Sequence, residues 1–126
     1  MSRQTIQTDK APAAVGTYSQ AVKVGNTVYI SGQIGLDPKT MALKEGFAAQ
    51  AEQVFENIKA ICAAAGGSLN DVVKFNVSLT DLNDFAALNE IFVAHLSEPY
   101  PARAAVQVAA LPKGSVVEIE SILYLE

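Results

Sequence analysis

The chain has 126 residues, half of them hydrophobic, and a formal net charge of −4 at pH 7. This length predicts one domain over residues 1–126, and the nine lysines and arginines form no basic run, which argues against nucleic-acid binding. The single cysteine, Cys62, and the single histidine, His95, exclude an internal disulfide and the usual zinc ligand sets, so we expect no metal site.

The hydropathy pattern also argues against a membrane partner. No apolar run approaches the roughly 20 residues that a membrane-spanning helix needs. Residues 1–16, MSRQTIQTDKAPAAVG, lack the apolar stretch of a signal peptide. We therefore expect a cytoplasmic protein that does not associate with membranes.

Strands are predicted in the N-terminal part of the chain. A weak strand covers residues 5–7, and two alternating strands flank Gly25-Asn26, a pair that is typical of a tight hairpin. The loop GLDPKT at residues 35–40 follows, with Pro38 suited to a turn.

An amphipathic helix and a half-buried strand come next. Apolar residues three and four apart predict the helix: Phe47, Ala51, Val54, Ile58, Ile61 and Ala65. Gly66-Gly67 suits its C-terminus, where a left-handed residue is common. Residues 71–79 then alternate, which predicts a strand whose apolar face carries Val73, Phe75, Val77 and Leu79.

A second helix and two further strands complete the pattern. Thr80-Asp81 predicts the helix start, and Asp84 is also a helix-start residue. The apolar stripe of this helix is Phe85, Leu88, Phe92 and Leu96, with the polar Asn89 on or beside it. The final strands cover residues 102–110 and 116–125.

Together these elements predict an α+β domain. Its mixed sheet would have about six strands, with both helices packed on one face. Nothing in the chain covers the opposite face, so we expect that face to pack against another subunit.

The last two strands carry charged residues in an apolar setting. Because strand side chains alternate, Arg103 and Gln107 share one face of their strand, and Glu118 and Glu120 share one face of theirs. If the valine-rich faces pack against the helices, all four residues lie on the uncovered face. Alanines flank Arg103, so this face would hold a shallow anion pocket. The alternative is that Arg103 pairs with Glu118 or Glu120 across neighbouring strands.

Other chemically reactive residues have structural interpretations. His95 lies near the end of the second helix, where its charge favours the helix dipole. Cys62 follows a core position and is a small helix filler. Ser31-Gly32 ends a strand but forms neither a nucleophile elbow nor a phosphate loop, and Tyr18 alone is uninformative.

Three long segments resemble one family over nearly the whole chain. They are APAAVGTYSQAVKVGNTVYISGQIGLDP, AAGGSLNDVVKFNVSLTDLNDFAALNEIF and PYPARAAVQVAALPKGSVVEIE, and they resemble the reactive intermediate deaminase A family, also called RidA or YjgF. The resemblance implies a chorismate-mutase-like fold and a homotrimer with ligand clefts between subunits. It also implies hydrolysis of 2-imino acids, which form from enamines such as 2-aminoacrylate, to 2-oxo acids and ammonia without a cofactor.

The same resemblance implies roles for individual residues. Arg103 would bind the substrate carboxylate, and Glu118 would hold the attacking water. The substrate-binding positions would be Tyr18, Ser31, Gly32, Asn89 and Ala105. Many family members have proline where this chain has Thr17, and cysteine where it has Ala105. The missing thiol argues against a chaperone role that depends on its oxidation.

Three alternatives to an imine deaminase stay open. The first is a non-catalytic module that binds a 2-oxo acid on the same fold. The others are an RNA-acting or translation-inhibiting protein and a chaperone that binds unfolded chains. The presence of both Arg103 and Glu118 favours catalysis, because a sensor needs only the arginine, and the acidic balance argues against RNA binding.

Overall fold

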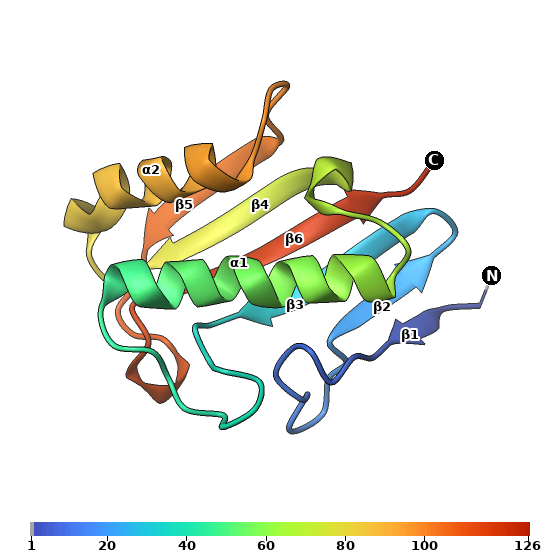
Figure 1. Ribbon diagram of the computed structural model, residues 1–126, viewed down its shortest axis with the longest axis horizontal. Helices are drawn as coiled ribbons and strands as arrows, with labels where there is room; N and C mark the ends of the chain where they lie inside the picture. The colour runs from blue at the N-terminus through green and yellow to red at the C-terminus, as the bar shows by residue number, and fades with distance from the viewer. Residues whose placement is uncertain (1) are drawn as a thin grey trace.

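The computed structural model describes residues 2–126 as one six-stranded sheet with two helices on the same face (Figure 1). The strands are β1 (Gln4–Ile6), β2 (Ala21–Val24), β3 (Thr27–Gln33), β4 (Val72–Leu79), β5 (Ala102–Gln107) and β6 (Val117–Tyr124). The helices are α1 (Phe47–Ala64) and α2 (Phe85–His95), and the 3₁₀ turns are η1 (Leu69–Asp71), η2 (Leu82–Asp84) and η3 (Pro112–Gly114). The predicted α+β architecture is confirmed.

The sheet is mixed. Its spatial order is β1-β2-β3-β6-β4-β5, and all neighbours are antiparallel except β4 and β5, which are parallel. The hairpin predicted at Gly25-Asn26 joins β2 to β3, and Gly25 has a φ of 59°. A positive φ is what the tight hairpin turn requires, and glycine adopts it at no steric cost.

The hydrophobic core lies between the sheet and the helices. The stripe predicted for α1 is confirmed, since Ala51, Val54, Ile58 and Ile61 are all fully buried. Phe55 contacts Phe75 of β4 and Phe92 of α2 edge to face, with ring centroids 5.9 and 5.2 Å apart. Each such aromatic pair contributes about 1 kcal/mol beyond its buried area, so this cluster ties both helices to the sheet.

The start of the second helix differs from the prediction. Asp81 caps the 3₁₀ turn η2, where its carboxylate accepts from the Asn83 amide at 2.9 Å, and α2 begins only at Phe85. The turn is held from the sheet side as well, because the Leu82 amide donates to the Gln107 side chain at 2.9 Å. Thr80-Asp81 therefore marks the entry to a turn that precedes the helix.

The predicted alternation of β4 is wrong at Val73, the first residue that was assigned to the apolar face. Val72 is 5% exposed and belongs to the core, whereas Val73 is 49% exposed. The pairing of β4 with β6 shifts register between Val72 and Lys74, and such an irregularity reverses the side-chain alternation locally. From Phe75 to Leu79 the predicted face is correct.

The predicted orientation of β5 is also wrong. In the parallel pairing with β4, Arg103 lies opposite Phe75 and Gln107 lies opposite Leu79. Paired residues share a face, so Arg103 and Gln107 point toward the helices, and Val106 is 53% exposed on the other face. Glu118 and Glu120, in contrast, lie on the uncovered face as predicted, opposite Ser78 and Asn76.

The uncovered face of the sheet carries large apolar side chains. Tyr29, Val106 and Tyr124 belong to it, and each is about half exposed at 51%, 53% and 50%. No helix within residues 2–126 is both long enough and apolar enough to cross a membrane. The subunit packing predicted for this face and the cytoplasmic location stay predictions.

Candidate active site

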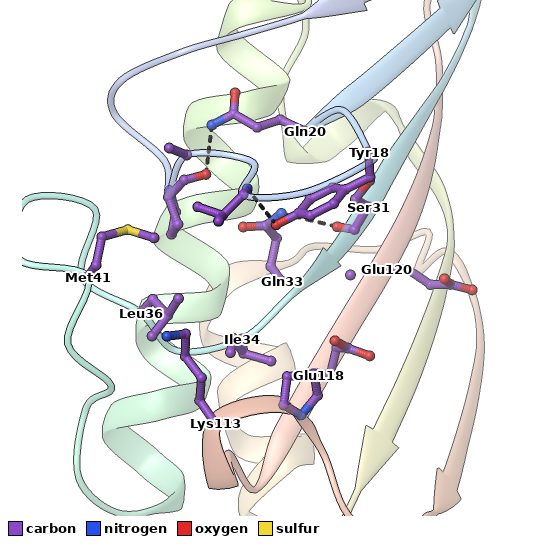
Figure 2. A pocket seen from close by; sticks show the side chains of 15 residues that line it. Tyr18, Gln20, Ser31, Gln33, Ile34, Leu36, Met41, Lys113, Glu118 and Glu120 are labelled. Atoms are coloured by element: carbon purple, nitrogen blue, oxygen red, sulfur yellow. Dashed lines mark hydrogen bonds between the residues drawn. The ribbon is translucent and has the colours of Figure 1, made fainter.

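A cavity of about 640 Å³ opens on the side of the sheet that the helices leave uncovered. Tyr18, Ser31, Gly32 and Glu118, all predicted site residues, line it together with Glu120. In Figure 2 the Glu118 carboxylate points toward the middle of the cavity, whereas Glu120 lies at its edge. The structure therefore brings together predicted site residues from three separate parts of the sequence.

The wall that carries Tyr18 is a loop held by a buried glutamine. The Gln20 side chain, 1% exposed, donates to the carbonyls of Thr8 and Pro12 at 2.9 and 2.8 Å and accepts from the Thr8 amide at 2.7 Å. Ser31 fastens the end of this loop to β3, since its hydroxyl donates to the Ser19 carbonyl at 2.6 Å. These bonds fix the loop although Tyr18 itself is 53% exposed.

Gly32 lies directly against Glu118. A Cβ atom added at Gly32 would meet the Glu118 Cδ at 2.9 Å and its Cγ at 3.1 Å. Both distances are shorter than ordinary van der Waals contacts, so a larger residue would displace the carboxylate. The absence of a side chain at position 32 therefore determines where Glu118 points.

The environment of Glu118 favours its protonated form. Burial raises the pKa of this half-buried carboxyl above its ordinary value of 4.5, and the negative charge of Glu120 raises it further. A carboxylate with raised proton affinity is a better acceptor for a proton taken from water. This property distinguishes Glu118 from an ordinary surface glutamate.

Arg103 and Asn89 line a second cavity of about 430 Å³, beside α2. The Arg103 Nη1 donates to the Asn89 Oδ1 at 2.7 Å. The guanidinium carbon lies 5.2 Å from the ring centre of Phe85 and 5.0 Å from that of Phe92, which are cation–π distances. The alternative of a cross-strand pair between Arg103 and Glu118 or Glu120 is wrong, because Asn89 is the partner of this side chain.

The two groups of residues occupy opposite faces of the sheet within one chain. Ala105 lies opposite Val77 on the helix side with Arg103, whereas Glu118 lies opposite Ser78 on the uncovered side. The sequence prediction that Arg103 and Glu118 share a face is therefore wrong. We name the two groups the Arg103 half-site (Arg103, Asn89, Ala105) and the Glu118 half-site (Tyr18, Ser31, Gly32, Glu118).

Sequence analysis missed three residues that shape these half-sites. Phe85 and Phe92 were assigned to the core stripe of α2, yet they support the guanidinium. Phe85 lies four residues before Asn89 and Phe92 lies three after it, so all three share one face of α2. This spacing could have indicated that both rings lie beside Asn89. Gln20 carried no signal, because a single buried amide looks like any loop glutamine.

The remaining reactive residues have structural surroundings. Cys62 is fully buried, and burial raises the pKa of its thiol to about 12, so the thiolate is scarce at neutral pH. His95 stacks on Phe55 with ring centroids 4.6 Å apart, and its Nε2 lies 3.0 Å from the Glu52 carboxylate. Among residues 2–126, no group of three or more His, Cys, Asp or Glu side chains could hold a metal ion.

Comparison with known proteins places the chain in a family. The model of the family described as endoribonuclease L-PSP matches residues 8–125. The chain belongs to the L-PSP/RidA family. Its structure superimposes on the crystal structure of RidA from the Antarctic bacterium Psychrobacter sp. PAMC 21119 with a TM-score of 0.96 and 89% identity, covering 97% of this chain and 99% of that one.

Other members of the L-PSP/RidA family are less similar and also match over most of their length. The human 2-iminobutanoate/2-iminopropanoate deaminase is 52% identical over 121 residues, which is 95% of this chain and 88% of that protein. The crystal structure of Escherichia coli TdcF with bound serine gives a TM-score of 0.91 at 44% identity, covering 98% and 99% of the two chains. The names within this family thus include both deaminase and endoribonuclease.

Proposed function

We propose that this protein hydrolyses reactive 2-imino acids, such as 2-iminopropanoate and 2-iminobutanoate, to 2-oxo acids and ammonia. One observation carries the proposal: Asn89 and two aromatic rings hold Arg103 at the wall of a cavity. Only its Nη1 is engaged by Asn89, so the other N–H groups are left to bind a carboxylate. The name of the human relative supports the same substrate class.

The reaction needs two functions from the protein. Arg103 would bind the substrate carboxylate through two parallel hydrogen bonds and fix the plane of the imine. Glu118 would orient a water molecule toward the imine carbon and take its proton as the C–O bond forms. This proton would then pass to the imine nitrogen, which gives a carbinolamine. The second proton of the water, now on the hydroxyl, would move to the amino nitrogen through Glu118 as the C=O bond forms, the C–N bond breaks and ammonia leaves. The substrate is already electrophilic, so the chain's own side chains supply this chemistry through positioning.

Because the two half-sites lie on opposite faces of one sheet, we propose that each complete site forms between two copies of the chain in a homotrimer. The half-exposed apolar side chains of the uncovered face, Tyr29, Val106 and Tyr124, support this assembly, since burying them between copies favours association. A closed ring of three copies would repeat one head-to-tail contact and give three equivalent clefts.

Hydrolysis of imines that a dehydratase releases from serine or threonine tests the proposal, with semicarbazide as the competing trap. Arg103→Ala should lose roughly 30-fold to several-thousand-fold in rate, because a desolvated charge loses its partner. Arg103→Lys should also fail, since an ammonium cannot form the planar fork. The exposed Arg3 offers a matched control, and Arg3→Ala should retain full activity. A wild-type protein that does not accelerate hydrolysis would refute the proposal.

The main alternative is a module that binds 2-oxo acids without turnover. The position and raised pKa of Glu118 favour catalysis over mere binding, since a sensor has no use for a proton acceptor. Calorimetric binding of 2-oxobutanoate by a wild-type protein that does not hydrolyse the imine would establish the alternative. The same binding with turnover identifies the ligand as a product.

A further inference from the structure

The cavity of the Glu118 half-site holds a second carboxylate that the proposed reaction does not use. Glu118 and Glu120 are two residues apart on β6, so they share one face of the strand, and both line the same cavity. Glu120 is not left free on the surface, because the Asn76 Nδ2 of β4 donates to its Oε1 at 3.0 Å. This hydrogen bond fixes the position of a negative charge beside Glu118.

We propose that Glu120 is a positioning residue for the hydrolysis, whose negative charge acts on Glu118 from the neighbouring position on the same face of β6. This inference rests on the proposed function. At a spacing of two residues along one strand the Cα atoms lie about 7 Å apart, and the two side chains leave the same face. Like charges on neighbouring positions of one face repel each other, and each then favours the protonated form of the other.

The other titratable groups that face Glu118 do not raise its proton affinity. In the proposed complete site Arg103 of a neighbouring copy would lower it, equally in wild type and in Glu120→Gln. Tyr18, from the loop before β2, and Lys113, from η3, line the same cavity. On β4 the charged residue of this face is Lys74, which lies opposite Ile122, beyond Glu120. Within residues 2–126, the charge that raises the pKa of Glu118 is that of Glu120, in addition to burial.

The chemical consequence concerns both halves of the reaction. A more basic Glu118 takes the proton of the attacking water more readily as the C–O bond forms. It still releases that proton to the leaving nitrogen, because an amine is far more basic than a carboxylate. Glu120 touches neither substrate nor water in this scheme and acts only through Glu118.

A carboxyl titration separates this inference from the proposed function. Wild type and Glu120→Gln would be labelled with ¹³C-glutamate and titrated by NMR, with Glu118→Gln used to assign the resonance. Glutamine keeps the shape of the side chain and removes its charge, so the pKa of Glu118 should fall toward its ordinary value. Glu56, exposed on α1 across the sheet, offers the matched charge control, and Glu56→Gln should leave this pKa unchanged.

The pH dependence of kcat/KM then tests the effect on turnover. Its lower limb reports the proton acceptor of the free enzyme, so in Glu120→Gln it should move to lower pH by the same amount. The substrate's own ionisation is common to both proteins and cancels from this difference. High salt screens the repulsion between the two carboxylates, so it should lower the pKa of Glu118 in wild type. The same salt should not lower this pKa in Glu120→Gln, which lacks the second charge.

The outcomes are distinct. An unchanged pKa of Glu118 in Glu120→Gln overturns the inference, whatever the enzyme activity. A lowered pKa with an unmoved kcat/KM limb also overturns it, because the interaction then has no role in turnover. A wild-type protein without imine hydrolysis refutes the proposed function, whereas the titration still decides whether Glu120 acts on Glu118.

Discussion

Glu118, the proposed proton acceptor, lies in an environment that disfavours its charged form. Burial and the charge of Glu120 both raise its pKa, so the folded protein binds this proton more tightly than the unfolded chain does. As pH rises above the ordinary value of 4.5, ionisation of Glu118 therefore opposes folding. A residue that costs stability at neutral pH is typical of a functional site.

The stability of Glu118→Gln should show this cost. At pH 7 we expect the variant to be more stable than wild type by under about 1 kcal/mol, since solvent screens a half-exposed carboxyl. The gain should vanish below about pH 4, where the carboxyl is protonated in both folded and unfolded states. Urea unfolding at both pH values measures it, and the exposed Glu45 provides the control Glu45→Gln. A variant less stable than wild type at pH 7 would contradict the prediction.

Gly32 should matter for activity more than for stability. In Gly32→Ala the new Cβ would lie 2.9 Å from the Glu118 Cδ, and the flexible side chain would rotate away to relieve the contact. We expect kcat to fall on the order of tenfold to a hundredfold because the proton acceptor is misplaced. Thermal unfolding should change little. A variant with normal kcat would show that the present orientation of Glu118 is not the productive one.

At the scale of elements, the loop between β3 and α1 depends on a close backbone contact. A Cβ atom at Gly35 would lie 2.6 Å from the Gln50 Cα, which belongs to α1 and cannot rotate aside. Gly35→Ala should therefore cost about 1–3 kcal/mol, the usual cost of overpacking. Gly67→Ala is the matched control, since its Cβ would meet only the ends of the Asp71 and Leu125 side chains at 2.7 Å. Denaturant unfolding should rank Gly35→Ala below Gly67→Ala, and equal losses would contradict this argument.

The elements also show which features a sequence can specify. The period of α1 and the alternation of β6 follow from burial on one face, and both predictions are confirmed. The segment ARAAVQ of β5 lacks such a signal, because alanine fits either face. Its orientation is set by the parallel register with β4, a contact between distant segments that no local pattern encodes.

The same limit explains which part of the candidate site was predicted. The family motifs named Arg103 and Glu118 as candidate site residues. Their placement on opposite faces follows from the sheet topology, which the motifs do not encode. Arginine could enter the helix side because its guanidinium lies over two aromatic rings and reaches Asn89 at the edge of the sheet. A prediction that places every charged strand residue on the uncovered face therefore misses an arginine on the helix side.

At the scale of the whole molecule, one chain carries the two proposed half-sites on opposite faces of its sheet. In the proposed mechanism the Arg103 half-site would bind the carboxylate without a proton acceptor, and the Glu118 half-site would have the reverse. A cyclic assembly resolves this because each copy offers both halves to different neighbours. The proposed mechanism therefore requires the proposed trimer, which would also cover the half-exposed apolar side chains of this face.

Mixed assemblies of two inactive variants test this requirement directly. Arg103→Ala and Glu118→Gln would be coexpressed with different tags, and assemblies that carry both tags would be isolated. If each cleft joins two copies, every mixed trimer holds one cleft with an intact Arg103 and an intact Glu118, so about a third of wild-type activity should return. Arg103→Ala mixed with Asn89→Ala should recover nothing, because both changes affect the same half-site. Inactive mixed trimers would show instead that Arg103 and Glu118 of one chain serve the same cleft.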